Sequence, residues 1–381
     1  MGKLSKSNRT YATVIGAGLA LSPIHNKWLT DITSIDGMAT LFIPAFGYGI
    51  WIFATGLFLR DNWQGLGDRK LYIPLLIIVA AMGISGITAD TLGGKVAPLF
   101  MGLSMFGLYL AARVLGKDIF MPLAIGAGIA SLGVIVSSVI NPGYLTGGLL
   151  FENNYDIVVG YVLLGAALYI HRYQWILASL ALVAMLLTGS PEGLFALGVL
   201  ALVVIWQRDW GRRLAIAFIP VTIGVVLLFS LGHGQQLYSY ALQVANGEAV
   251  VPHIAETPEA SIYPGTIDYR VWVIKQAMIN IKPLGDGYVV TAFRQKIVHN
   301  VPLIIVQQLG YPGILAGIAW LFVSIYCLIR TKYKYAWALM LGLSVFDHFT
   351  WTQIGHWWWM IIGVSSTSGI KTDQMFKGIQ E

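Results

Sequence analysis

The sequence predicts an all-α polytopic membrane protein that forms a single integral membrane domain over residues 1–381. Of its 381 residues, 56% are hydrophobic and only 11% are charged, and the mean hydropathy is +0.70. Soluble domains carry about 25% charged residues, so this composition is typical of a chain that lies mostly in lipid. The apolar residues also occur in long runs, separated by shorter polar stretches.

About twelve of these runs are long enough to be spanning helices, since a crossing needs roughly 17–25 apolar residues. The basic N-terminus loosely resembles a signal peptide, but no A-x-A-like cleavage site follows, so we expect the first helix to be retained. The expected spans lie near Tyr11–Ile24, Met38–Leu59, Leu71–Ala89, Val96–Leu115, Ile119–Ile140, Asp156–Ile170, Trp175–Thr188, Gly193–Trp206, Leu214–Leu231, Val301–Ile329, Ala336–Phe346 and Trp351–Val364.

The basic residues predict how these helices are oriented. With the N-terminus placed in the cytoplasm, most of the 24 basic residues fall in connections on that side, which is the bias that orients membrane proteins. We therefore expect both termini to face the cytoplasm. The formal charge of +6 does not indicate nucleic-acid binding, because the basic residues lie in short connections without an aromatic-interleaved patch. The single Cys327 excludes a disulfide framework and a cysteine-based metal site.

The longest polar interval is an expected external loop over residues 232–300, just before the tenth span. Loops of this length are usually functional or disordered, and the aromatic residues of this one argue against disorder. Apolar residues at helical spacing predict an amphipathic helix near residues 267–282, which Pro283 and Gly285 would end. Helices of this kind commonly lie on the membrane surface.

His299 and Asn300 stand where this loop meets the tenth span, at the expected boundary between water and lipid. A histidine titrates near neutral pH, so His299 could take a proton from a hydroxyl group as a general base. The alternative is an interfacial histidine that hydrogen-bonds Asn300 or a backbone carbonyl. Asn300 and Gln307 could orient His299 or an acceptor molecule.

The loop also carries four cations, Arg270, Lys275, Arg294 and Lys296. Guanidinium groups grip diphosphates in bidentate fashion, so the two arginines could hold such a group. The alternative is a solvated amphipathic face that touches lipid headgroups, which the side-chain type favours for the two lysines.

Glu192 lies in an expected external turn, directly after Ser190-Pro191. A carboxylate between two spans is costly unless it is used or solvated. The alternative is an ordinary tight turn with Glu192 in water. Asn153, in the neighbouring external segment Glu152–Asp156, suits either sugar binding or ordinary turn chemistry.

Asp347 and His348 lie in the last expected external turn, where they could form an orienting pair. The segment His356–Trp359 follows shortly after. Its three tryptophans suit an interfacial aromatic belt.

Six segments of the chain form an ordered set: Asn153-Asn154, Tyr269–Trp272, Lys282–Gly287, His299–Leu303, Leu309–Gly313 and Asp347–Thr352. Together these segments resemble the O-antigen ligase and O-antigen polymerase family, which are membrane glycosyltransferases of the GT-C type. One segment departs from the family pattern, since the family shows Thr-x-Ser-Arg-Gly where this chain has Thr188–Gly193 without an arginine.

The resemblance implies transfer of a glycan from an undecaprenyl-diphosphate-type lipid donor to an acceptor hydroxyl on the outer, periplasmic face of the plasma membrane. It implies that His299 is the general base and that Arg270 stabilises the leaving diphosphate, without a metal or another cofactor. The expected partners are the lipid-linked donor, a glycan or lipid-linked acceptor, and membrane lipids. The expected substrate-binding residues are Arg294, Asn300, Trp272, Glu192, Asn153, Asp347 and His348.

Several alternatives stay open from the sequence. O-antigen ligases, repeat-unit polymerases and protein-directed transferases share the donor and differ in the acceptor. A polysaccharide transporter or lipid flippase belongs to another class, and the low charge within the predicted spans argues against it. A non-catalytic subunit of a glycan assembly system is a third possibility, which the missing arginine keeps open.

Overall fold

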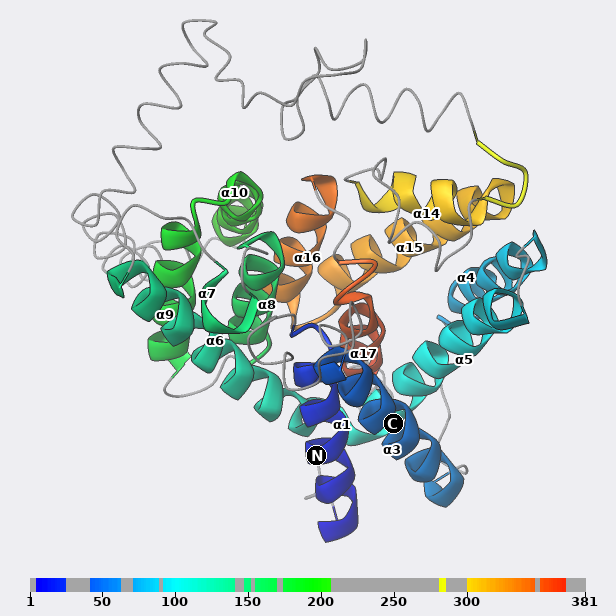
Figure 1. Ribbon diagram of the computed structural model, residues 1–381, viewed down its shortest axis with the longest axis horizontal. Helices are drawn as coiled ribbons and strands as arrows, with labels where there is room; N and C mark the ends of the chain where they lie inside the picture. The colour runs from blue at the N-terminus through cyan, green and yellow to red at the C-terminus, as the bar shows by residue number, and fades with distance from the viewer. Residues whose placement is uncertain are drawn as a thin grey trace, which may run out of the picture.

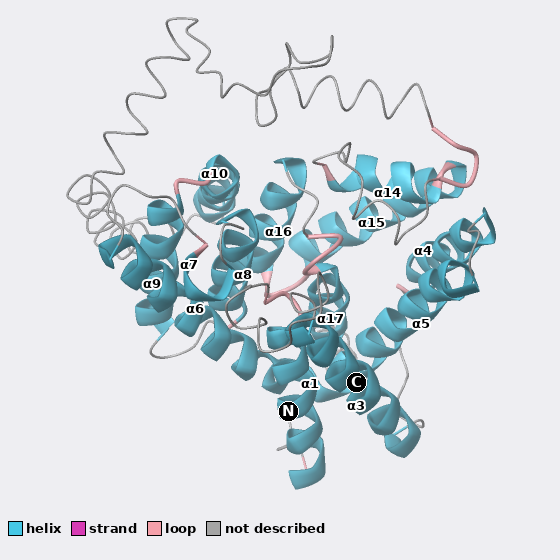
Figure 2. Ribbon diagram, viewed as in Figure 1, coloured by secondary structure: helices cyan, strands magenta, loops and turns pink. Residues whose placement is uncertain are grey.

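The computed structural model describes residues 5–24, 42–62, 71–88, 92–140, 147–151, 155–169, 174–206, 281–285, 300–346 and 350–367. Within these ranges the chain forms helices joined by turns, and no strand occurs (Figure 2). The predicted all-α class is therefore confirmed for the part of the chain that the structure describes.

Apart from α7 and the run Val301–Ile329, the helices begin and end within a few residues of the predicted spans wherever both can be compared. Two short 3-10 turns, Gly86–Thr88 and Gly116–Ile119, follow α4 and α5. The α-helices are α1 (Lys6–Leu21), α3 (Phe42–Asn62), α4 (Tyr72–Ser85), α5 (Leu92–Leu115), α6 (Phe120–Ile140), α7 (Gly148–Phe151), α8 (Tyr155–Leu168), α9 (Gln174–Thr188), α10 (Pro191–Trp206), α14 (Val301–Leu309), α15 (Tyr311–Arg330), α16 (Lys334–Phe346) and α17 (Gly355–Thr367).

One predicted span is wrong. The run Val301–Ile329 is not a single helix, because Gly310 separates α14 from α15 with φ +67° and ψ −143°. This left-handed backbone cannot continue an α-helix, and glycine adopts it without a steric penalty. The expected ninth span, near Leu214–Leu231, lies outside the described residues.

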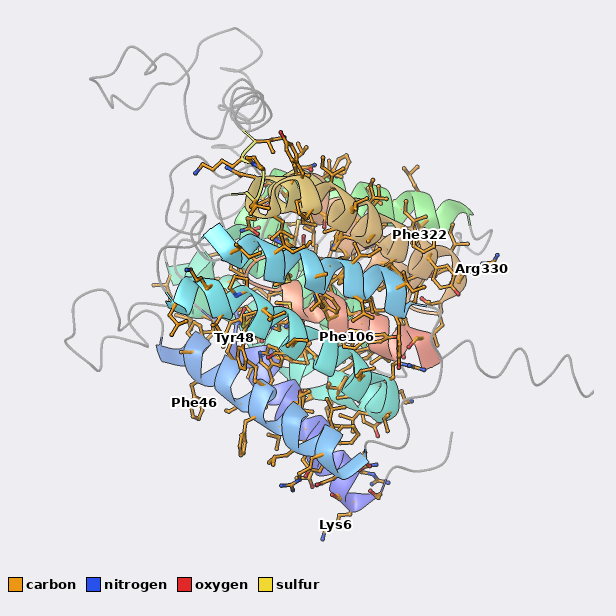
Figure 3. All side chains as sticks on the ribbon, turned by 90° about the vertical axis from the view of Figure 1, so that its right-hand side faces the viewer. Lys6, Phe46, Tyr48, Phe106, Phe322 and Arg330 are labelled. Atoms are coloured by element: carbon orange, nitrogen blue, oxygen red, sulfur yellow. The ribbon has the colours of Figure 1, made fainter. Side chains whose placement is uncertain are left out.

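Three described segments are long and apolar enough to cross a membrane: Ile43–Asn62, Gly94–Ile140 and Tyr311–Arg330. The second of these contains both α5 and α6, which Gly116 separates with φ +62°. Large apolar side chains point outward from the bundle. Phe46 and Phe322, labelled in Figure 3, are each 56% exposed. Such a surface is unfavourable in water and suits contact with hydrocarbon.

Helix α17 lies in the middle of the bundle, with α1 and α3 on one side and α15 and α16 on the other (Figure 1). Its three tryptophans, Trp357, Trp358 and Trp359, are at most 1% exposed. Trp357 donates its indole N–H to the Leu19 carbonyl at 2.9 Å, and Trp358 donates to the Ser324 hydroxyl at 2.8 Å. The interfacial aromatic belt is therefore wrong for these residues. All three tryptophans belong to the buried core. The indole N–H groups of Trp357 and Trp358 can be buried there because each donates to a buried partner.

His356 joins the start of α17 to α1 and α3. Its Nε2 atom lies 2.5 Å from the Ser22 hydroxyl oxygen, and its Nδ1 atom lies 3.4 Å from the Tyr48 hydroxyl. The imidazole ring also stacks on Trp51, with ring centroids 5.8 Å apart. A fully buried imidazole needs such partners, because an unsatisfied polar group in an apolar core is costly.

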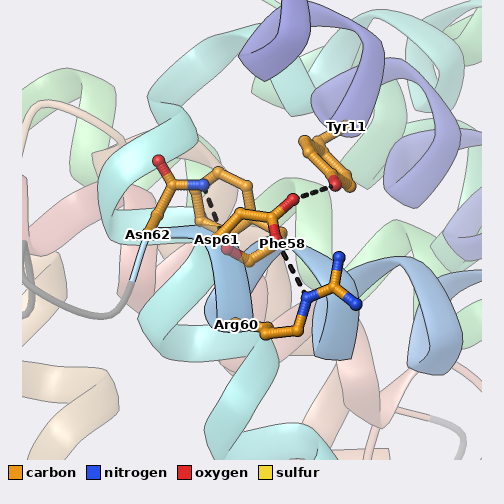
Figure 4. Close-up of polar contacts among 5 residues, drawn as sticks. All are labelled: Tyr11, Phe58, Arg60, Asp61 and Asn62. Carbon is orange, nitrogen blue, oxygen red and sulfur yellow. Dashed lines mark hydrogen bonds and ion pairs between the residues drawn. The ribbon is translucent and has the colours of Figure 1, made fainter.

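Near the other end of α1 and α3, a polar contact joins the same two helices (Figure 4). Tyr11 donates its hydroxyl to Asp61 at 2.6 Å, and Arg60 donates its Nε–H to the same carboxylate at 3.0 Å. The Arg60 side chain is 71% exposed, so solvent screens this ion pair and it adds little to stability. The helix pair therefore depends more on the contacts of buried Ser22 and Trp51 and half-buried Tyr48.

The close approach of α17 to α5 requires glycine at position 363. A Cβ atom added to Gly363 would lie 2.7 Å from the Ala112 Cβ atom and would collide with the Tyr109 carbonyl oxygen. We expect Gly363→Ala to destabilise the protein by about 1–3 kcal/mol through overpacking, measured as a lower melting temperature in detergent.

Gly56→Ala in α3 is the matched control, because no atom lies within 4 Å of the position that its Cβ would take. Replacing glycine by alanine inside a helix is otherwise favourable by about 0.5–1 kcal/mol, so this variant is expected to melt at or above the wild-type temperature. Equal melting temperatures for the two variants would contradict the described packing of α17 on α5.

Candidate functional site

The candidate site is organised around α14, whose first turn is held by Asn300. The Asn300 side-chain oxygen accepts a hydrogen bond from the Leu303 backbone N–H at 3.2 Å, which caps the helix. Its amide nitrogen donates to the Val345 carbonyl at 3.0 Å, in the last turn of α16. Asparagine is a preferred N-cap residue and Pro302 suits the first helical turn, so the local sequence Asn-Val-Pro explains why the helix begins here.

This contact joins two segments that sequence analysis singled out separately. Asn300 directly follows His299, and Val345 lies two residues before Asp347-His348. A residue next to His299 is therefore hydrogen-bonded to a residue close to Asp347-His348. Asn300 itself has a structural function, although an amide can make further hydrogen bonds beyond the two described. Its predicted contact with substrate stays a prediction.

The other end of α14 is held by a turn from the loop that precedes it. Tyr311 donates its backbone N–H to the Pro283 carbonyl at 2.9 Å, and Gly285 closes the turn by donating to Lys282 at 3.0 Å. Gly285 has φ +76°, and a Cβ atom there would collide with the Gln308 carbonyl oxygen. A Cβ atom at Gly310 would collide with the Pro283 carbonyl oxygen. Glycine is thus required on both sides of this backbone contact.

The flank of α14 is held by a buried hydrogen bond. Trp351 donates its indole N–H to the Gln308 side-chain oxygen at 2.8 Å, and both residues are at most 3% exposed. One residue earlier, the Thr350 hydroxyl lies 2.8 Å from the Ser344 hydroxyl of α16. The segment that follows Asp347-His348 is therefore fixed to both α14 and α16.

Gln307 is a predicted candidate residue, whereas Gln308 is not among the predicted residues. The signal for Gln308 is helical spacing, because Val301, Ile304 and Ile305 form the buried face of α14 and position 308 continues it. A glutamine on a buried face needs a hydrogen-bonding partner, and Trp351 is that partner here.

Glu192 is buried at the start of α10, with only 2% of its surface exposed. Its carboxylate accepts a hydrogen bond from the Ser190 hydroxyl at 3.0 Å, and Gly189 makes the turn with φ +65°. The alternative of a tight turn with Glu192 in water is therefore wrong. The turn is present, but the carboxylate is enclosed by protein.

Helix α10 connects Glu192 to the α14 region through α16. A Cβ atom added to Gly342 would lie only 2.7 Å from the Ala196 Cα atom, so the two helices are in close contact there. Ala196 lies about one helical turn from Glu192, and Gly342 lies less than one turn from Val345. Glu192 and the Asn300–Val345 contact therefore belong to the same part of the bundle, where α16 lies between α10 and α14 in Figure 1.

The remaining predicted site residues lie outside the described residues. They are Asn153, Arg270, Trp272, Arg294, His299, Asp347 and His348, and their roles stay predictions. Of the expected external loop over residues 232–300, the structure describes 281–285 and Asn300. Within the described ranges, no group of three or more His, Cys, Asp or Glu residues could hold a metal ion.

Comparison with known proteins gives no family for this chain. No protein-family model matches it, and no curated protein is significantly similar to it.

If Asn300 both caps α14 and ties it to α16, Asn300→Ala should cost more than the loss of a cap alone. Ser5→Ala in α1 is the matched control, because the Ser5 hydroxyl accepts a cap hydrogen bond from Asn8 at 3.2 Å in an exposed setting. Loss of a cap costs about 0.5–2 kcal/mol.

The lost bond to Val345 adds about 1 kcal/mol. We therefore expect Asn300→Ala to lower the melting temperature more than Ser5→Ala does. An equal or smaller effect would show that the bond to Val345 does not hold α14.

Proposed function

We propose that this chain is a membrane glycosyltransferase that moves a glycan from a polyprenyl-diphosphate lipid to an acceptor hydroxyl. One observation carries the proposal. Four segments that resemble the O-antigen ligase and polymerase family, although separated in sequence, have described residues in contact around α14, namely Pro283–Gly285, Asn300, Gly310 and Trp351. A shared site requires such segments to lie around one helix, and their arrangement supports the proposal.

The proposed topology has about twelve spanning helices with both termini in the cytoplasm, and the loop over residues 232–300 on the outer side. The active site would then face the periplasm or exterior from the plasma membrane. The arrangement of charged ends is consistent with this orientation. Lys6 and Arg330, both assigned to the cytoplasmic side, lie toward one end of the helices in Figure 3, and Phe46 and Tyr48 lie toward the other.

The proposed reaction is a direct displacement at the anomeric carbon of the donor. His299 takes the proton of the acceptor hydroxyl, the oxygen forms a bond to the anomeric carbon, and the bond from that carbon to the diphosphate oxygen breaks. Arg270 stabilises the negative charge that develops on the leaving diphosphate, and its bidentate geometry suits that group. Arginine supplies the charge that a divalent metal supplies in other glycosyltransferases, so the proposal includes no metal or other cofactor.

Glu192 is proposed to bind the sugar and not the diphosphate. A buried carboxylate accepts hydrogen bonds from sugar hydroxyls but repels phosphate, and Glu192 stands near the position where the family has its arginine. Arg294 is therefore the proposed second cation of the diphosphate site. Trp272, Asn153, Asp347 and His348 are proposed to contact the glycan or to orient these groups.

A transporter or lipid flippase is the second candidate. It is favoured by the polar cluster of buried His356 and Ser22 with half-buried Tyr48, because ionisable groups inside a helix bundle often mark transport paths. The hydrogen bonds of this cluster equally explain it as a structural joint between α1, α3 and α17. A non-catalytic assembly subunit is the third candidate, since the family arginine is missing.

If His299 is the general base, His299→Ala should lower glycan transfer by about 10²–10⁴-fold while expression and melting temperature stay near wild type. The measurement is release of polyprenyl diphosphate by the purified variant. His253→Ala is the control, because it removes another histidine from the same expected loop and should transfer normally. Near-wild-type transfer by His299→Ala would rule out this residue as the base.

A further inference from the structure

Three cations lie in or beside the short turn that joins α15 to α16. Arg330 ends α15, Lys332 lies in the turn, and Lys334 begins α16. Arg330 and Lys332 are exposed. The sequence from Tyr311 to Phe346 contains no acidic residue, so no carboxylate within these two helices offsets the charges. The helix dipole accounts for a cation in the last turn of α15, but not for Lys332 between the two helices.

Hydrogen bonds and an aromatic contact give this turn a defined shape. The Thr331 hydroxyl donates to the Cys327 carbonyl at 2.7 Å and accepts the Tyr333 backbone N–H at 3.3 Å. The Thr331 backbone N–H donates to the same carbonyl at 3.1 Å. The Tyr333 ring packs edge-on against Phe120 of α6, with ring centroids 5.4 Å apart. The cations are therefore carried by a turn that is held to α15 and to α6.

The surroundings of the turn leave its positive charge uncancelled. The Lys332 ammonium lies 5.2 Å from the centre of the Tyr333 ring, and a neutral ring attracts a cation without removing its charge. Burial raises the pKa of the Tyr333 hydroxyl to about 12, so the ring is neutral at pH 7. The exposed residues Lys117 and Asp118, which lie shortly before Phe120, carry opposite charges and add none to the total.

An exposed apolar stripe on α15 leads to the turn. Its members recur at helical spacing and are 42–61% exposed: Ile318, Phe322, Ile325 and Ile329. The helix from Ile318 to Ile329 is about 16 Å long, close to the ~15 Å of hydrocarbon in one leaflet of a bilayer. Figure 3 shows Phe322 on the outer surface of α15 and Arg330 at its end. The stripe and the turn together form an amphipathic surface with a cationic end.

We propose that this surface binds an anionic phospholipid, with the phosphate against Arg330 and Lys332 and an acyl chain along the apolar stripe. A zwitterionic lipid gains less from the turn, because its own ammonium group offsets its phosphate. In the proposed topology the lipid belongs to the cytoplasmic leaflet, where basic clusters next to spanning helices bind anionic headgroups. The inference goes beyond the proposed function and does not depend on glycan transfer.

The test measures binding to the purified protein in an uncharged detergent, by native mass spectrometry and by melting temperature. Phosphatidylglycerol should bind and raise the melting temperature at concentrations where phosphatidylcholine does neither. Glycerol phosphate, which has the phosphate but no acyl chain, should not bind at these concentrations. Equal binding of the two phospholipids would overturn the proposal. Binding of glycerol phosphate as tight as that of phosphatidylglycerol would also overturn it and indicate a site for free phosphates.

The double variant Arg330→Gln/Lys332→Gln removes both exposed charges of the turn and leaves the apolar stripe intact. Each cation near an anionic headgroup contributes roughly fivefold in affinity, so phosphatidylglycerol should bind roughly 25-fold more weakly. Without added lipid the variant should melt near the wild-type temperature, because both side chains are exposed. Unchanged affinity for phosphatidylglycerol would contradict the proposed site.

Lys6→Gln/Arg9→Gln is the matched control, because it removes two exposed cations from α1. Lys6 lies toward the same end of the bundle as Arg330 in Figure 3, and α17 separates α1 from α15 in Figure 1. Charges farther apart than about 10 Å are screened by physiological salt, so this variant should bind phosphatidylglycerol within about twofold of wild type. Equal weakening in the two double variants would show that only diffuse positive charge attracts the lipid, and would overturn the site.

Discussion

The position of α14 is the constraint on which the proposed site depends. This short helix is held by Asn300 at its first turn, by Gln308 on its flank and by the glycine contact at Gly310. Two of these attachments are directional hydrogen bonds, and the third is a backbone contact that admits only glycine. An apolar contact alone would not fix the position of the helix so closely. Because His299 directly precedes Asn300 in the sequence, the proposed base is covalently joined to the anchored first turn of this helix.

The rest of the fold supports this helix through buried polar groups that have partners. In an apolar bundle, helix association receives little help from the hydrophobic effect, so close packing and hydrogen bonds between helices matter more. Helix α17 illustrates both, with Gly363 against α5 and with Trp357 and Trp358 bonded to α1 and α15. The same principle explains why the Trp351 indole, next to the proposed site, is bonded to Gln308.

Sequence analysis predicted the all-α class and most helix limits, because apolar runs and basic connections determine them. It did not predict the break at Gly310, since hydropathy carries no information about a left-handed backbone. It left open an interfacial belt for Trp357–Trp359 and a solvated turn for Glu192, because composition does not distinguish a buried polar group with partners from an exposed one. Gln308 was missed for the same reason. The roles of His299 and Arg270 follow from chemistry and resemblance, and they stay predictions.

The most direct test of the central claim is a transfer assay with purified protein, a polyprenyl-diphosphate glycan and candidate acceptors in the presence of EDTA. The account predicts that the glycan moves to an acceptor and that one polyprenyl diphosphate is released for each glycan transferred. It predicts that EDTA does not prevent this transfer, because arginine and not a metal stabilises the leaving group. Movement of intact donor across a bilayer without any release of polyprenyl diphosphate would contradict the account and indicate a transporter.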